Sequence, residues 1–155
     1  MAAADALRDS GLQPEAVAGF SLGEVAAAAF CGLTAFETAF RLVSRRADLM
    51  QACPSAHPGL MYAVLKLTSD EVTALCGGID RAYPVNFNSP AQTVVACAKE
   101  SEQALLDAVK AAGGRAMKLA VSGAFHSPFM ADAARGMREA LSGIEFGEGH
   151  LPLYA

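Results

Sequence analysis

The sequence predicts a mixed α/β protein in which an antiparallel α/β segment is inserted into a larger sheet. A short apolar run at 16–18 is followed by a Gly-x-Ser-x-Gly turn and an alanine-rich helical stretch. Residues 59–122 then alternate strand-like and helical segments in the order β-α-β-β-α-β. After them the chain returns to helix and ends in a strand-like run at 151–155.

The first 58 residues predict helix, strand, helix and helix. The first two helices are predicted over 2–10 and 22–31, and each is followed by a glycine that predicts its end. The predicted strand is the apolar run at 16–18, before Ser21. Thr34-Ala-Phe-Glu37 has the pattern of a capping box, and it predicts a third helix that runs to about Ala52, before a proline.

The third helix presents an arginine in an unusual position. Its apolar residues recur at helical spacing and predict a buried face of Phe36, Phe40, Val43, Ala47 and Met50. Arg41 and Arg45 are expected to face solvent, whereas Arg46 lies only about 60° from Val43, at the edge of that face. Such an arginine either pairs structurally or extends to water, or it binds the carboxylate of a substrate through two parallel hydrogen bonds.

The stretch from 59 to 122 predicts a compact unit of its own. Four strands and two helices in the order β-α-β-β-α-β are typical of a ferredoxin-like subdomain with both helices on one face. The expected strands cover 60–67, 82–88, 93–98 and 115–121, and the expected helices cover 69–77 and 100–112. We therefore divide the chain into a core of 1–58 with 123–155 and an insert of 59–122.

The Gly19-Phe-Ser-Leu-Gly23 turn predicts a nucleophile. A serine on a strained strand-to-helix turn presents its hydroxyl, and we expect both flanking glycines to be needed because bulk there would clash. The following helix points free N–H groups at the site, so the amide of Leu22 can stabilise an oxyanion. An ordinary βα turn without catalytic function remains the alternative.

His126 is the candidate general base. Ser127 and Pro128 have the pattern of an N-cap and a first helical residue, so His126 stands just before a helix that runs to about Leu141. The positive end of that helix disfavours an imidazolium and favours a ring that accepts a proton. A polar residue at a turn is the alternative interpretation.

Composition argues against several classes of function. A net charge of −4 provides no basic surface for nucleic acid, and no apolar run approaches the roughly 20 residues of a membrane helix. The N-terminal residues lack the pattern of a signal peptide, so we expect a cytoplasmic protein. The four cysteines are expected to be reduced and largely buried, and neither they nor the histidines have metal-ligand spacing.

Four stretches together resemble the malonyl-CoA:acyl-carrier-protein transacylase family and the acyltransferase domains of fatty-acid and polyketide synthases. In chain order they are Gly19-Phe-Ser-Leu-Gly-Glu24, Arg41-Leu-Val-Ser-Arg-Arg46 with Met50-Gln51, Val85-Asn-Phe-Asn-Ser-Pro90 with Gln92, and Gly123-Ala-Phe-His-Ser-Pro128 with Met130. The resemblance implies a partial α/β-hydrolase-like core with a ferredoxin-like insertion.

The resemblance also implies a mechanism. Ser21 matches the nucleophile, His126 its base and Leu22 an oxyanion-hole amide, while Arg46 matches the arginine that holds the malonyl carboxylate. Phe125 stands where malonyl-selective members tend to carry phenylalanine. The implied reaction moves malonyl from malonyl-CoA to the phosphopantetheine thiol of acyl carrier protein through an acyl-serine, without any further cofactor.

This sequence departs from the family's pattern in one important way. Family members begin with a strand and a Gly-Gln-Gly loop that completes the oxyanion hole, and they continue past the position of Ala155. We therefore expect a chain truncated at both ends, with reduced stability and weak activity. Loss of one oxyanion donor lowers the rate of a serine enzyme by ~10²–10³.

Two other functions stay open on the sequence. A serine hydrolase would use the same turn, but the chain contains no Asp-Gly motif of patatin-like enzymes, and its candidate acids lie in the insert. An esterase also has no use for Arg46. The third possibility is a catalytically inert fragment that survives as a binding or structural piece.

Overall fold

The computed structural model describes residues 2–155 of the chain and shows a mixed α/β protein. Its contacts divide into two compact units. The terminal unit contains the residues up to Ala47 together with Met137–Ala155, and the central unit contains Asp48–Gly136. Two helices, α3 (Phe36–Ala56) and α6 (Ala131–Leu141), pass from one unit into the other.

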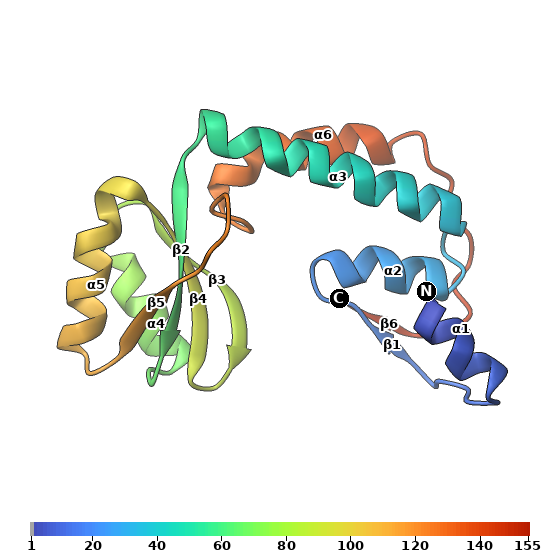
Figure 1. The fold of residues 1–155 in the computed structure, drawn as a ribbon, viewed down its shortest axis with the longest axis horizontal. Coiled ribbons are helices and arrows are strands. Elements are labelled where there is room, and N and C mark those ends of the chain that lie inside the picture. Colours follow the sequence, from blue (N-terminus) through green and yellow to red (C-terminus); the bar gives the residue numbers. More distant parts are fainter. Residues whose placement is uncertain (1) are drawn as a thin grey trace. The chain divides into compact units, whose positions relative to one another are not determined.

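The terminal unit is built on a two-stranded parallel sheet (Figure 1). Its strands β1 (Val17–Ala18) and β6 (Leu153–Tyr154) pair with Val17 opposite Leu153 and Ala18 opposite Tyr154. The helices α1 (Ala2–Asp9) and α2 (Leu22–Phe30) flank β1 in the chain. Both helices and both strands confirm the elements predicted from the sequence.

The central unit contains a four-stranded antiparallel sheet in the order β3-β4-β2-β5. Its elements follow the predicted order β-α-β-β-α-β. They are β2 (Gly59–Leu65), α4 (Ser69–Gly77), β3 (Ala82–Ser89), β4 (Gln92–Ala98), the 3₁₀ turn η1 (Lys99–Ser101), α5 (Glu102–Ala111) and β5 (Arg115–Lys118). The last strand is shorter than predicted, because only Arg115–Lys118 pair with β2.

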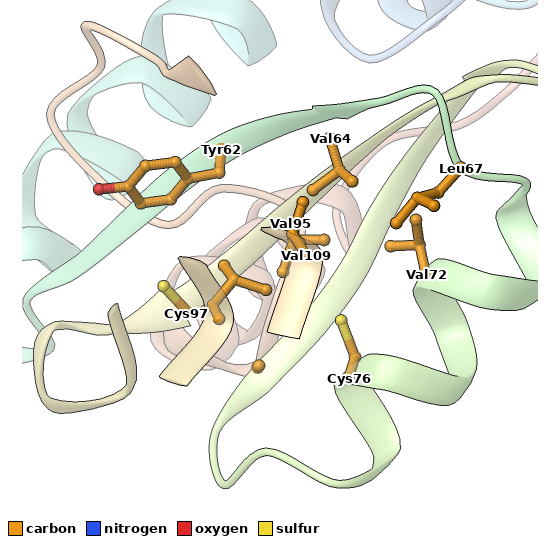
Figure 2. Packing of buried hydrophobic residues seen from close by; sticks show 10 residues of the cluster. Tyr62, Val64, Leu67, Val72, Cys76, Val95, Cys97 and Val109 are labelled. Atoms are coloured by element: carbon orange, nitrogen blue, oxygen red, sulfur yellow. The ribbon is translucent and has the colours of Figure 1, made fainter. Parts of the chain in front are cut away.

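One face of this sheet packs against α4 and α5, as predicted for the insert. Figure 2 shows Tyr62 and Val64 of β2 and Val95 of β4 on the side of Val72 and Val109, which belong to the two helices. All of these side chains are at most 3% exposed. The other members of this cluster are Leu67, Cys76, Ala82, Cys97 and Leu105.

The opposite face of the sheet is also covered. Alternate residues of the same strands, such as Met61 and Ala96, pack against Cys53 of α3 and against Phe129 and Ala133. Burial on both faces explains why β2 and β4 are almost continuously apolar. The predicted insert boundaries at 58/59 and 122/123 fall inside the central unit, because residues on both sides of them cover this second face.

The third helix is longer than the sequence predicted. It continues through Pro54 to Ala56 instead of ending near Ala52. Pro54 lies in the last turn, where its missing N–H removes one backbone hydrogen bond. At the end of the helix, the His57 N–H donates a hydrogen bond of 2.8 Å to the Cys53 carbonyl. The helix also begins at Phe36, and Ala39 N–H bonds the Ala35 carbonyl, so Thr34 is not its cap.

The buried face predicted for this helix is confirmed only in part: Val43 and Met50 are partly buried, and Met50 packs against the cluster on the second face of the sheet, but Ala47 is exposed. Phe36 and Phe40 are 51% and 64% exposed, whereas Ala39, Leu42 and Cys53 are at most 7% exposed. The predicted and the observed buried faces both have helical spacing. Because apolar side chains recur on two faces of this helix, hydrophobicity alone does not tell which face packs against the rest of the protein. Arg46 follows Leu42 by four residues and therefore lies along the buried stripe rather than at its edge.

A capping box does occur, at the start of α4. The Thr68 hydroxyl accepts a hydrogen bond from the Glu71 amide, and the Glu71 carboxylate accepts one from the Thr68 amide. The four cysteines are all free and buried, as predicted. No helix within residues 2–155 is long and apolar enough to cross a membrane.

Candidate active site

Ser21 stands on a strained turn between β1 and α2. Its backbone has φ +54° and ψ −109°, a conformation that residues with a side chain rarely adopt. Ser21 is the N-cap residue of α2, yet its side chain does not cap the helix, so the hydroxyl is directed to other partners. Strained backbone conformations of this kind persist only where the surrounding structure enforces them, and they cluster at functional sites.

The two glycines of the turn are not equivalent. A Cβ atom on Gly19 would lie 2.5 Å from the Cα of Glu24 and 2.6 Å from its amide nitrogen, so the chain passes too closely for any side chain. A Cβ atom on Gly23 would meet no atom within 4 Å. The expectation that both positions exclude bulk was therefore right for Gly19 and wrong for Gly23.

Arg46 lies beside the serine. Its guanidinium donates a hydrogen bond to the Ser21 Oγ over 2.9 Å, and both side chains are partly buried. Arg41 and Arg45 on the same helix are exposed, as predicted. Of the three arginines, the structure thus brings the one singled out by the sequence to the candidate nucleophile.

Leu22 is the first residue of α2, so its amide has no acceptor within the helix. The two following amides turn back into the chain: Gly23 N–H bonds the Phe20 carbonyl at 2.9 Å and Glu24 N–H bonds the Ser21 carbonyl at 3.2 Å. The Leu22 amide is therefore the first-turn donor nearest to Ser21 in the chain that can serve a ligand.

His126 and Phe125 belong to the central unit. His126 is exposed and has φ +59°, a left-handed conformation. The sequence does not indicate it, because a positive φ is usually predicted from a glycine and this position holds a histidine. Its loop is held on both sides by buried residues, Ala124 and Phe129. Phe125 is partly buried and packs against the cluster that covers the sheet face opposite α4 and α5.

The segment after His126 begins as predicted. Ser127 Oγ accepts a hydrogen bond from the Phe129 amide and donates one to the Ala124 carbonyl. Pro128 opens a 3₁₀ turn, η2 (Pro128–Met130), which leads directly into α6. These contacts fix the backbone on either side of the histidine.

Two further features bear on the kind of site. A cavity of about 500 Å³ between α1, β1 and α2 is lined almost entirely by apolar side chains, and neither Ser21 nor Arg46 lines it. In the described part of the chain, histidine, cysteine and acidic residues form no group that could hold a metal ion.

Residues 1–154 match the family described as the acyl transferase domain. The chain belongs to this acyltransferase family. A malonyl CoA-acyl carrier protein transacylase of Synechocystis sp. is 37% identical over 150 residues, which cover 97% of this chain and 50% of the relative. The enzyme of the same name from Haemophilus influenzae is 37% identical over 138 residues, covering 86% and 44%.

Solved structures agree with this assignment. The acyltransferase chain superposes with a TM-score of 0.91 on an acyl-carrier-protein S-malonyltransferase from Burkholderia pseudomallei, at 36% identity, covering 98% of this chain and 51% of that one. A malonyl-transacylase in complex with its type II polyketide-synthase acyl-carrier protein gives a TM-score of 0.89 at 38% identity, covering 96% and 50%. The acyltransferase chain thus spans about half the length of these relatives.

Proposed function

We propose that this chain belongs to an enzyme that transfers malonyl from malonyl-CoA to the phosphopantetheine thiol of acyl carrier protein. The observation that carries the proposal is the hydrogen bond from Arg46 to Ser21. A cation that can hold a carboxylate stands next to a hydroxyl that can accept an acyl group. The names of the relatives support the same reaction.

The spacing between these two groups favours a short dicarboxylic acyl chain. In malonyl-CoA a single methylene separates the carboxylate from the thioester carbonyl. A guanidinium 2.9 Å from Ser21 Oγ can hold that carboxylate while the carbonyl carbon lies at the hydroxyl. An acyl group without a carboxylate would leave the partly buried guanidinium unpaired, which disfavours it.

The proposed reaction has two steps. Ser21 Oγ bonds to the thioester carbon and its proton passes to His126, while the Leu22 amide stabilises the oxyanion. The C–S bond then breaks, and the coenzyme A thiolate takes the proton as it leaves. In the second step the phosphopantetheine thiol gives its proton to His126 and attacks the malonyl ester. The ester C–O bond then breaks, and His126 returns the proton to the departing Ser21 Oγ.

Phe125 is proposed to line the acyl site, where its ring leaves little room for a branched acyl group. For the fold, we propose that β1, β6 and their helices are part of an α/β-hydrolase-like core and that β2–β5 form a ferredoxin-like insert. The element order and the sheet order β3-β4-β2-β5 support this proposal. The free cysteines are consistent with the reducing cytoplasm as the place of action.

Acylation with radiolabelled malonyl-CoA tests the function. We expect label on Ser21 that is lost in Ser21→Ala and that moves to phosphopantetheinylated acyl carrier protein on addition. Release of free malonate in place of transfer would instead identify a serine hydrolase. A chain that binds malonyl-CoA but takes up no label would be the inert fragment, and the proposed activity would be refuted for this chain.

A further inference from the structure

A second, polar pocket lies in the central unit. It has a volume of about 140 Å³ and is lined by His57, Arg81, Tyr83, Pro128 and Phe129. These residues come from the loop after α3, from β3 and the residue just before it, and from η2, so no sequence spacing could have indicated the pocket. Neither the relatives' names nor the proposed reaction assigns a function to it.

Arg81 supplies a fixed positive charge to this pocket. Its guanidinium carbon lies 4.9 Å from the centre of the Phe129 ring, and Tyr83 packs edge-on against the same ring at 6.0 Å. Within the described chain, the acidic group in salt-bridge range of this arginine is Glu100, at 4.0 Å and with a side chain that is 79% exposed. A pair so long and so exposed neutralises little of the charge.

His57 adds a second polar group. Its Nε2 lies 3.3 Å from the Oδ2 of Asp132, and Asp132 also accepts a hydrogen bond from Arg135 at 2.7 Å. These contacts, the one with His57 first, lower the pKa of Asp132, and an ionised carboxylate can only accept a hydrogen bond from the His57 ring. The partners that the structure gives Asp132 are His57 and Arg135, whereas Arg81 pairs with Glu100.

We propose that this pocket binds a phosphomonoester group. The guanidinium offers paired N–H donors, the Tyr83 hydroxyl offers a third, and the second ring nitrogen of His57 can donate to a phosphate oxygen or accept the proton of a monoprotonated phosphate. Donors on separate elements suit a tetrahedral anion better than a planar carboxylate. A volume of about 140 Å³ equals roughly four or five waters, which is enough for a phosphate group.

The backbone of Arg81 supports a dedicated position. Arg81 has φ +52°, a conformation that an arginine rarely adopts, and its carbonyl is held by the Ala98 amide at 3.0 Å. Asparagine tolerates this conformation, so Arg81→Asn removes the charge without adding backbone strain. Arg115, an exposed arginine of β5 that does not line the pocket, provides the matched control Arg115→Gln.

Titration with inorganic phosphate at constant ionic strength, followed by ¹H–¹⁵N NMR, tests the proposal. We expect saturable shifts at the amides of Arg81, Tyr83 and Phe129, weaker shifts with acetate, and at least about tenfold weaker phosphate binding in Arg81→Asn. Arg115→Gln should bind as the parent does. Shifts that do not saturate, or that weaken equally in both variants, would overturn the proposal.

The source of the phosphate is distinguished by competition. If coenzyme A displaces phosphate and its dephospho form does not, the ligand is the 3′-phosphate of the thioester substrate, and this part rests on the proposed function. If neither competes, the pocket serves a separate phosphorylated molecule. The titration is repeated in Ser21→Ala, which cannot be acylated, so phosphate binding is scored independently of malonyl transfer. Saturable shifts in this variant support the phosphate site even if malonyl transfer fails. Their absence in this variant would refute the site.

Discussion

The guanidinium of Arg46 donates a hydrogen bond to the hydroxyl oxygen of Ser21 over 2.9 Å, although 25 positions separate the two residues in the chain. The serine is held by a strained turn and the arginine by a long helix, so both groups are positioned by rigid elements. This contact joins the candidate nucleophile to the candidate carboxylate-binding group. The first prediction tests that pairing.

Arg46→Ala is expected to lower the efficiency of acylation by malonyl-CoA by about 10- to 100-fold, because a charge-assisted, partly buried pair is lost. Acylation by acetyl-CoA, which has no carboxylate, should not fall and should improve relative to malonyl-CoA. The neighbouring Arg45→Ala removes an exposed arginine from the same helix and should change neither rate. Unaltered malonyl preference in Arg46→Ala would refute the carboxylate role.

The two glycines of the turn should respond differently to alanine. Gly19→Ala would place a Cβ 2.5 Å from the Glu24 Cα, so we expect a loss of about 1–3 kcal/mol or more in the free energy of unfolding. Gly23→Ala meets no atom within 4 Å and lies inside α2, where alanine favours helix by up to about 1 kcal/mol. Urea unfolding measures both, and equal stability of the two variants would contradict the geometry.

His126→Asn is expected to abolish acylation of Ser21 while preserving the fold. Asparagine tolerates the φ of +59° at this position but cannot act as a base at neutral pH. The control is His150→Asn, which removes a histidine that packs beside Gly32. Single-turnover acylation should be lost in the first variant and retained in the second, and a near-parental rate in His126→Asn would assign the base elsewhere.

Stability should fall above about pH 9. Burial raises the pKa of the Cys76 and Cys97 thiols from 9.0 to about 11, so the folded state holds protons that the unfolded state releases. The stabilisation is complete below pH 9 and is lost as the pH rises toward 11, with each thiol contributing up to about 1.4 kcal/mol per pH unit.

Urea unfolding between pH 8 and pH 11 measures this slope. Cys76→Ala and Cys97→Ala should each flatten it, and the double variant should flatten it most. Tyr62 keeps part of the slope in every variant, because burial and its bond to Glu102 also raise the pKa of that phenol. An identical slope in the parent and in the double variant would show that the thiols are not responsible.

Local sequence patterns predicted most of the secondary structure, because helix caps, turn residues and hydrophobic periodicity each act within a few residues of the chain. Ser127 and Pro128 mark the start of the segment that leads into α6, and the apolar runs of β2 and β4 mark strands buried on both faces. The patterns failed where a local signal was ambiguous. Pro54 did not end its helix, since a proline in the last turn removes only one backbone bond.

The choice of helix face was decided by packing. Phe36 and Phe40 have the same helical spacing as a buried stripe, yet Ala39 and Leu42 are the residues that are buried. The different roles of Gly19 and Gly23 depended in the same way on how closely Glu24 returns to the turn. Neither result follows from hydrophobicity or from a motif.

The sequence by itself determined the order of the elements and the strand-turn-helix that carries Ser21. It also singled out Arg46 as the candidate carboxylate-binding arginine. These follow from periodicity, turn chemistry and residue type, all of which act within a few residues of the chain. Only the tertiary structure decided that Arg46 bonds Ser21 and that His57, Arg81 and Tyr83 share a pocket. Contacts of this kind join distant segments, so they depend on how whole elements pack and not on any local preference.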